Sequence, residues 1–147
     1  MIDVDGTLVD SVPDLAYCVD QMMIRLEMPI RGEERVRHWV GNGVPRLVER
    51  ALTDELDGFP SQEAFDKAYP IFLDLYAQNS SVRSTLYEGV IEGLDYLKSK
   101  DCLLSCVTNK AEQFTLPLLK SLGIIDYFGI VISGDTLEKK KPDPLPL

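Results

Sequence analysis

The amino-acid sequence predicts an α/β fold whose core is interrupted by a helical insert. Apolar residues recur at helical steps through most of the first half of the chain. In the second half, helical patterns alternate with short apolar runs, and such alternation implies a parallel sheet. The core is therefore expected to comprise residues 1–12 and 84–147, with residues 13–83 as the insert. Linkers are expected near residues 10–14 and 80–88.

Composition limits the classes of function. The chain has 147 residues, of which 45% are hydrophobic, enough for one sizeable core or for a core with a small second module. A formal net charge of -9 argues against binding to nucleic acid or to anionic membranes. No stretch reaches the roughly 20 apolar residues of a membrane span, and a cytoplasmic location is expected. Cys18, Cys102 and Cys106 lack metal-type spacing and are expected to be small core residues in a reducing compartment.

Helical periodicity marks three segments of the insert. The first begins at Ser11, with a proline in its first turn, and ends before Pro29. The second follows a glycine-rich turn at residues 41–43. The third covers residues 62–78, and Pro70 should kink it or divide it in two.

In the second half, two apolar runs are expected to be strands. Leu103–Val107 is short, apolar and bounded by polar residues, as in a buried strand, and Ile130–Ile132 forms a second, shorter run. Helical stripes precede each run, over residues 91–97 and 114–122. Gly123 is expected to end the second of these helices.

Two carboxylates stand two residues apart in Asp3-Val4-Asp5-Gly6, before a glycine that permits a sharp turn. Alternate side chains of a strand share a face, so Asp3 and Asp5 can reach one ligand if the extended geometry persists. The glycine turn can instead re-aim Asp5. Paired carboxylates attract a divalent cation, and hard oxygen ligands favour Mg²⁺. The alternative is an Asx-rich turn that holds no ligand.

The longer string D-x-D-G-T-L-V-D-S, residues 3–11, is much more specific. With later segments in the same order, it resembles the haloacid dehalogenase-like superfamily, and within it the bacterial phosphoglycolate phosphatases. The resemblance covers essentially the whole chain and implies a Rossmann-like parallel sheet core with an inserted helical cap domain. The later matching segments are Trp39–Val44, Val107–Lys110, Ser133–Thr136 and Lys141–Pro144.

The resemblance implies a role for each of five core residues. Asp3 would be the nucleophile that forms an aspartyl-phosphate, and Asp5 the general acid that protonates the leaving alkoxide and later activates water. Thr108 would hydrogen-bond a phosphoryl oxygen, helped by the backbone at Asn109. Lys141 would neutralise charge on the nucleophile and the phosphoryl group. Asp3 and Asp5 would also be ligands of Mg²⁺.

Some of these residues also have ordinary structural interpretations. Thr108, taken alone, is typical of a helix N-cap. The run Lys139–Lys141, taken alone, is typical of a solvated basic surface. Only Lys141 precedes a proline as the family pattern requires, so the role is assigned to it. Asp5 favours phosphoryl chemistry, because relatives that dehalogenate lack the second aspartate.

The insert contributes candidate substrate-binding residues. In relatives the region that matches Gly41, Asn42 and Gly43 faces the active site. Arg46 and Arg50 are weaker candidates for binding a substrate carboxylate. The alternative is that the glycines form an ordinary helix connector and the arginines the polar face of their helix.

The sequence therefore predicts a Mg²⁺-dependent phosphatase that hydrolyses a small phosphorylated metabolite, with 2-phosphoglycolate as the favoured ester. The rival interpretations are a sugar-phosphate mutase of the same superfamily and a non-catalytic fragment. Family members complete the magnesium site with acidic residues on a later loop, and this chain ends at Pro146-Leu147 before such a segment. The expectation is a chain truncated at both ends, with an incomplete core and weak Mg²⁺ binding.

Overall fold

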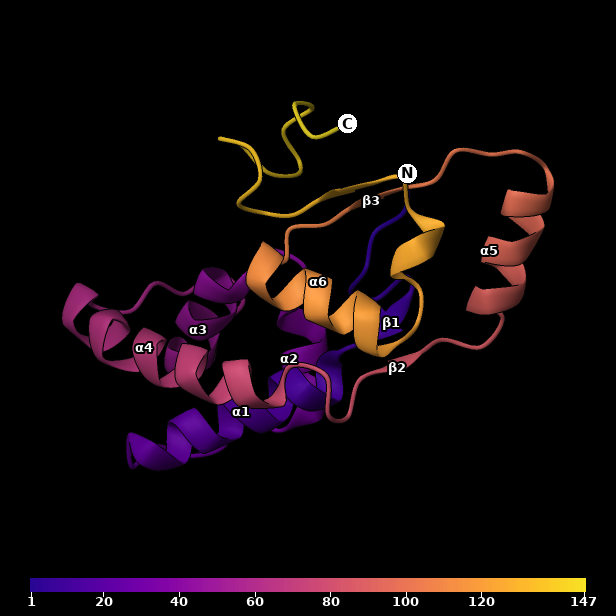
Figure 1. Ribbon diagram of the computed structural model, residues 1–147. Coiled ribbons are helices and arrows are strands. Elements are labelled where there is room, and N and C mark those ends of the chain that lie inside the picture. Colours follow the sequence, from indigo (N-terminus) through magenta and orange to yellow (C-terminus); the bar gives the residue numbers. More distant parts are fainter. The chain divides into compact units, whose positions relative to one another are not determined.

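The computed structural model describes residues 1–147 and divides the chain into two compact units (Figure 1). Unit 1 comprises Met1–Asp10 and Thr85–Leu147, and unit 2 comprises Ser11–Ser84. The sequence analysis placed these divisions after residues 12 and 83. No helix is long and apolar enough to cross a membrane.

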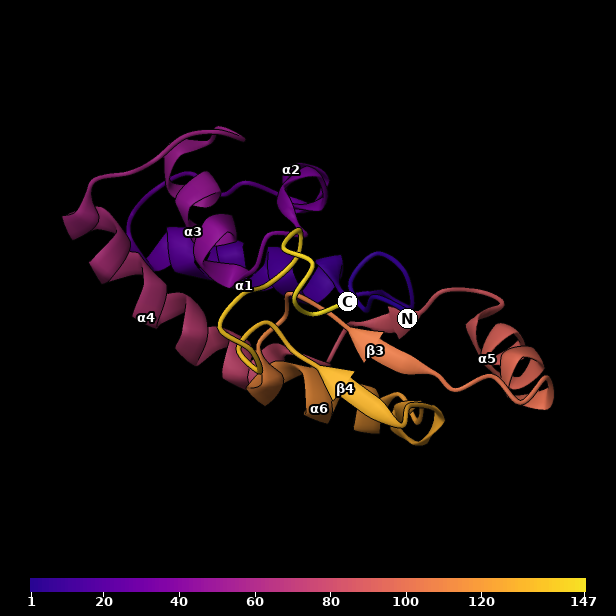
Figure 2. The same ribbon diagram turned by 90° about the horizontal axis from the view of Figure 1, so that it is seen from above.

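Unit 1 is an α/β unit, and its two longest strands are parallel. Ser105 lies opposite Ile130 and Val107 opposite Ile132, and the two strands run side by side in the same direction (Figure 2). Ile2 bridges Cys106 in the same parallel sense, on β3. The prediction of an α/β fold with parallel strands is confirmed. The elements are β1 (Val9–Asp10), β2 (Thr85–Leu86), α5 (Val90–Ser99), β3 (Ser105–Val107), α6 (Glu112–Ser121), the 3₁₀ helix η1 (Ile125–Tyr127) and β4 (Ile130–Ile132).

The apolar run before β3 is buried only in its last part. The predicted strand began at Leu103, but that side chain is 100% exposed and β3 begins at Ser105. The register explains the difference, because the pairing of β3 with β4 starts at Ser105. Before Ser105, the Leu104 carbonyl accepts a hydrogen bond from the Gly129 amide. Cys102 is also exposed, so the expectation of three core cysteines is wrong at this position.

The core of unit 1 lies between its strands and helices. The first segment, up to and including β1, supplies three buried apolar side chains, and α6 supplies two that are fully buried. These side chains hold the first residues of the chain against β3. Their packing thereby positions the motif Asp3-Val4-Asp5-Gly6. The buried members are Val4, Leu8, Val9, Leu94, Leu104, Cys106, Leu118, Leu119 and Ile124.

The predicted linkers contain a second small sheet. Val9 pairs with Leu86 and Asp10 with Thr85 in an antiparallel ribbon of β1 and β2. The Tyr87 amide donates to the Leu8 carbonyl and extends the pairing. The chain therefore leaves unit 1 and returns to it at adjacent positions.

Unit 2 is all helical. Helix α1 packs against α2 and α4, and α3 packs against α4. Val19, Met22 and Met23 of α1 are fully buried, as are Phe72 and Tyr76 of α4, so these apolar stripes form the core of the unit. The helices are α1 (Val12–Arg25), α2 (Glu33–Trp39), α3 (Val44–Thr53) and α4 (Gln62–Asn79).

Pro70 does not divide α4, which is one helix of 18 residues. Proline removes one backbone hydrogen bond from a helix interior. Here the buried side chains of Ala68, Phe72 and Tyr76 flank the proline on both sides and pack into the core of unit 2. Packing of this apolar face offsets the missing bond.

A buried carboxylate joins the two ends of unit 2. Asp14, in the first turn of α1, is 0% exposed and accepts hydrogen bonds from the amides of Arg83 and Ser84 at 2.9 and 2.8 Å. The Ser84 hydroxyl donates to the same carboxylate at 2.6 Å. The segment that returns from α4 is thus fixed against the start of α1.

Asp14→Ala is expected to lower the free energy of unfolding by about 3 kcal/mol, because the partly buried amide of Arg83 and the buried amide of Ser84 lose a charged acceptor. Urea denaturation followed by circular dichroism measures the loss. Asp66→Ala, at an exposed position on α4, is the control and should change stability by less than about 0.5 kcal/mol. Equal stability of the two variants would contradict a stabilising role for Asp14.

Candidate active site

The carboxyl ends of the strands in unit 1 bring separate segments together. The Ile2 amide donates to the Ser105 carbonyl at 2.9 Å, which sets the residue after Ile2 beside the end of β3. The Thr108 amide donates to the Ile132 carbonyl, also at 2.9 Å, across the ends of β3 and β4. Polar side chains that follow parallel strands gather at this edge of a sheet, where α/β proteins bind ligands.

Asp3 and Lys141 form an ion pair at this edge. Lys141 Nζ lies 2.8 Å from Asp3 Oδ2 and also donates to the Val107 carbonyl at 2.8 Å. Asp3 Oδ1 accepts a hydrogen bond from the Val4 amide. The Asp3 side chain keeps 40% of its surface exposed, so it is accessible to a ligand while a cation lies beside it.

Asp5 pairs with a different lysine. Lys110 Nζ lies 3.1 Å from Asp5 Oδ1, and the two side chains are 2% and 15% exposed. Gly6, at φ 78°, begins a tight turn in which its amide donates to the Val9 carbonyl. The turn re-aims the chain directly after Asp5, a conformation that glycine adopts without strain.

No role was predicted for Lys110 from the sequence. It appeared only as the last residue of a matching segment, Val107–Lys110. The available signal was its place two residues after Thr108, within a polar segment that leaves the end of a buried strand. That signal does not show that the lysine turns inward, because lysine at the surface is the general rule.

Thr108 does not cap the following helix. Helix α6 has Ala111 at its N-cap position, and the amide of Glu112 is bound by Asp135 Oδ1 at 2.8 Å. The helix-cap interpretation of Thr108 is therefore wrong. Thr108 is 3% exposed, and its hydroxyl oxygen accepts from the Lys110 amide at 3.2 Å.

Close contacts hold the loops after β3 and β4 together. The Asn109 side-chain amide donates to the Lys141 carbonyl at 3.0 Å. Gly134 approaches the Asn109 backbone so closely that a Cβ atom would lie 2.2 Å from the Asn109 carbonyl oxygen. Only glycine fits this position, and its amide donates to the Lys110 carbonyl at 2.8 Å.

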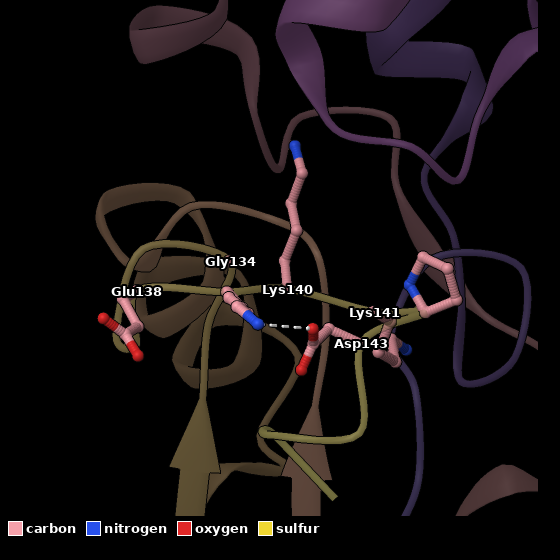
Figure 3. A pocket seen from close by; sticks show the side chains of 7 residues that line it. Gly134, Glu138, Lys140, Lys141 and Asp143 are labelled. Atoms are coloured by element: carbon pink, nitrogen blue, oxygen red, sulfur yellow. Dashed lines mark ion pairs between the residues drawn. The ribbon is translucent and has the colours of Figure 1, made fainter.

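The three consecutive lysines differ in their surroundings. Lys139 and Asp143 form an ion pair at 3.1 Å, drawn as the dashed line in Figure 3. The Lys139 side chain is 60% exposed. Lys140 points away from Glu138 and Asp143 (Figure 3). Only Lys141 reaches an acidic residue of the DxD motif. The loop lines an open hollow of about 780 Å³, formed by Gly134, Glu138, Lys139, Lys140, Lys141, Pro142 and Asp143.

The sequence profile described as haloacid dehalogenase-like hydrolase matches residues 1–147. The chain belongs to this family. It is 65% identical to a phosphoglycolate phosphatase of Nitrosococcus oceani and 47% identical to one of Thiobacillus denitrificans, in each case over 100% of this chain and 65% of the relative. A crystal structure of a predicted phosphoglycolate phosphatase from Haemophilus somnus superimposes with a TM-score of 0.88 at 33% identity, over 98% of this chain and 65% of that one. The chain thus spans about 65% of the length of these relatives.

Cys106 lies close to the acidic motif of this haloacid dehalogenase-like hydrolase. Its burial raises the pKa of the thiol to about 12, and the neighbouring charge of Asp3 contributes to the rise. A thiolate, not a thiol, is the reactive nucleophile. Cys106 is therefore excluded as a nucleophile at neutral pH. The candidate nucleophile at this edge of the sheet is the exposed Asp3 carboxylate.

The donors of the DxD motif fit a divalent cation by their chemistry. Asp3 and Asp5 present carboxylate oxygens, the hard ligands that Mg²⁺ prefers, and Asp3 is accessible to solvent. Each carboxylate also pairs with a lysine in the structure. The structure contains no group of three or more His, Cys, Asp or Glu side chains placed to hold a metal.

The candidate substrate-binding residues of the insert lie in unit 2. Asn42 Oδ1 accepts a hydrogen bond from Arg50 at 3.0 Å, and Arg50 also donates to the Trp39 carbonyl at 2.5 Å. Arg50 is 8% exposed, so it does not belong to an exposed polar helix face. It instead fixes the chain on both sides of Gly41.

Arg46 has several partners within unit 2. Its guanidinium pairs with Glu49 at 2.7 Å and donates to the carbonyls of Gly58 and Leu56 at 2.8 and 2.9 Å. It also lies over the Phe59 ring, 4.2 Å from the ring centroid. These contacts give Arg46, in the first turn of α3, a clear structural role: it holds the segment that follows the helix.

Proposed function

We propose that the protein hydrolyses a small phosphomonoester, with 2-phosphoglycolate as the favoured substrate, through an aspartyl-phosphate intermediate. The observation that carries the proposal is the exposed Asp3 carboxylate beside Lys141, with Asp5 two residues along and paired separately to Lys110. Two carboxylates with separate cation partners suit two different tasks. The names of the relatives support the choice of ester.

The first chemical step is displacement at phosphorus. An oxygen of Asp3 forms a bond to phosphorus as the bond from phosphorus to the ester oxygen breaks. A proton passes from the Asp5 carboxyl group to the leaving alkoxide. Lys141 neutralises negative charge that would otherwise repel the phosphate from Asp3.

Water completes the cycle. Asp5, now a carboxylate, takes a proton from a water molecule, whose oxygen attacks phosphorus and breaks its bond to Asp3. Thr108 and the backbone at Asn109 are proposed to hold the phosphoryl oxygens. Mg²⁺, when bound by Asp3 and Asp5, would supply positive charge to the phosphoryl group.

We assign substrate selection to unit 2, acting as a cap domain. The proposed residues are Gly41, Asn42, Gly43 and Arg46, from the turn before α3 and its first turns. Arg50 supports this turn through its bonds to Trp39 and Asn42. A cytoplasmic location is also proposed, because the cysteines are free thiols, as is usual in a reducing compartment.

Phosphate release from a panel of small esters tests the proposal on the full-length protein. We expect kcat/KM for 2-phosphoglycolate to exceed that for other small phosphate esters by about 10-fold or more, the range that pocket contacts supply. Removing divalent cations with a chelator should abolish release, and adding Mg²⁺ should restore it. Equal rates for all esters would contradict the substrate, and conversion of the ester to a bisphosphate would indicate a mutase instead.

A further inference from the structure

We propose that Lys110 is a positioning residue that holds the Asp5 carboxyl group in place to protonate the leaving alkoxide. The proposal deepens the proposed phosphatase function and rests on it. Its basis is the contact of Lys110 Nζ with Asp5 Oδ1 at 3.1 Å, made by a side chain that is only 2% exposed. The contact engages Oδ1 of the Asp5 carboxyl group.

The backbone of Lys110 is anchored by three hydrogen bonds. Its amide donates to Thr108 Oγ1 at 3.2 Å. Its carbonyl accepts from the Gly134 amide at 2.8 Å and from the Thr115 hydroxyl at 3.2 Å. Because its backbone is held in this way and its side chain is buried, the ammonium group of Lys110 has little freedom to move.

Asp5 needs such support because of its place in the chain. It stands directly before Gly6, whose positive φ begins a turn. The two residues that follow Asp5, Gly6 and Thr7, are exposed. A general acid works only within about 2.6–3.2 Å of the atom that it protonates. Lys110 supplies a contact at Oδ1 that fixes the end of this side chain.

Stability alone gives a weak reason for this lysine. Burial of a cation costs free energy that its partner only partly repays, and replacing a buried ion pair with apolar groups is often neutral or stabilising. The orientation of Asp5 gives a better reason than stability for the Lys110–Asp5 ion pair. Lys110→Met keeps the length of the side chain and removes its charge, so it separates the two roles.

The chemistry gives a readout that a structural role would not produce. In an alkyl phosphate the departing oxygen must receive the Asp5 proton as the bond to phosphorus breaks. In 4-nitrophenyl phosphate the departing nitrophenolate is stable without a proton. Misplacing Asp5 should therefore affect the alkyl ester far more, whereas damage to the fold should affect both esters alike.

The experiment compares kcat/KM for 2-phosphoglycolate and 4-nitrophenyl phosphate in the full-length protein, because kcat/KM covers the steps only as far as the first cleavage at phosphorus. Lys110→Met should lower kcat/KM for the alkyl ester by about 100-fold, the lower range for loss of general acid catalysis, and for the nitrophenyl ester by less than about 5-fold. Lys120→Met, at an exposed position on α6, should change neither. Equal losses on both esters in Lys110→Met would overturn the proposal.

Crystal structures of the wild type, Lys110→Met and Lys110→Gln provide a readout without turnover. The Asp5 carboxyl group should move or occupy more than one rotamer in both variants, while Asp3 and Lys141 keep their contact. An unmoved Asp5 in either variant would overturn the proposal, whatever the activity. A wild-type protein that hydrolyses neither ester would instead overturn the phosphatase function, and the position of Asp5 would still decide the role of Lys110.

Discussion

Asp3→Asn is expected to abolish phosphate release while leaving the fold intact. The substitution keeps the shape of the side chain and its acceptor oxygen for the Val4 amide, but removes the anionic oxygen that would attack phosphorus. Removing the nucleophile in covalent catalysis costs about 10⁴-fold or more in kcat. Phosphate release from 2-phosphoglycolate measures the effect, and circular dichroism checks the fold.

Asp126→Asn is the matched control for this variant, since Asp126 is an exposed aspartate of unit 1 remote from the DxD motif in sequence. Its activity should equal that of the wild type. Incorporation of labelled phosphate offers a second test, because an acyl phosphate at Asp3 should be trapped by acid quench in the wild type and absent in Asp3→Asn. Turnover by Asp3→Asn at the wild-type rate would refute the assignment of the nucleophile.

Lys141→Ala should lower kcat/KM by about 100-fold, the effect of removing a preorganised group that stabilises charge. Lys141 contacts both Asp3 and the Val107 carbonyl, so its loss leaves the proposed nucleophile, Asp3, without this cation and releases the loop that carries Lys141. Steady-state kinetics with 2-phosphoglycolate measures the change.

The same loop supplies the control. Lys139 is two residues away and 60% exposed, and it pairs with Asp143 instead of the DxD motif. Lys139→Ala should change kcat/KM by less than about 3-fold, because an exposed ion pair contributes little. Small, equal effects at the two positions would return Lys141 to the interpretation of a solvated basic surface.

The resemblance of the ordered motifs to the haloacid dehalogenase-like superfamily assigned Asp3, Thr108 and Lys141 to one site. The structure brings Asp3 and Lys141 into contact and sets Thr108 at the end of β3, while their catalytic roles stay predictions. The apolar runs predicted only the strands that precede such residues, and the family pattern supplied the roles. The parallel pairing of β3 and β4 was predictable from the same runs.

Other features depend on contacts that no local pattern records. Lys110 looks like any lysine near the surface, and only the fold shows that it turns inward to Asp5. Leu103 looks like part of a buried strand, yet the register of β3 with β4 leaves it exposed. Residues 9–10 and 85–86 are too short to show a strand pattern and become strands only by pairing with each other.

The pairing of Asp10 with Thr85 has a consequence for how such a protein can evolve. The 74 residues of unit 2, Ser11 to Ser84, leave and rejoin the sheet at directly opposed positions, so their number does not affect the spacing of the strands. A shorter, longer or unrelated domain can be spliced between these two residues while the ladder keeps its register. A lineage can therefore change the length of the insert without altering the pairing of β1 with β2.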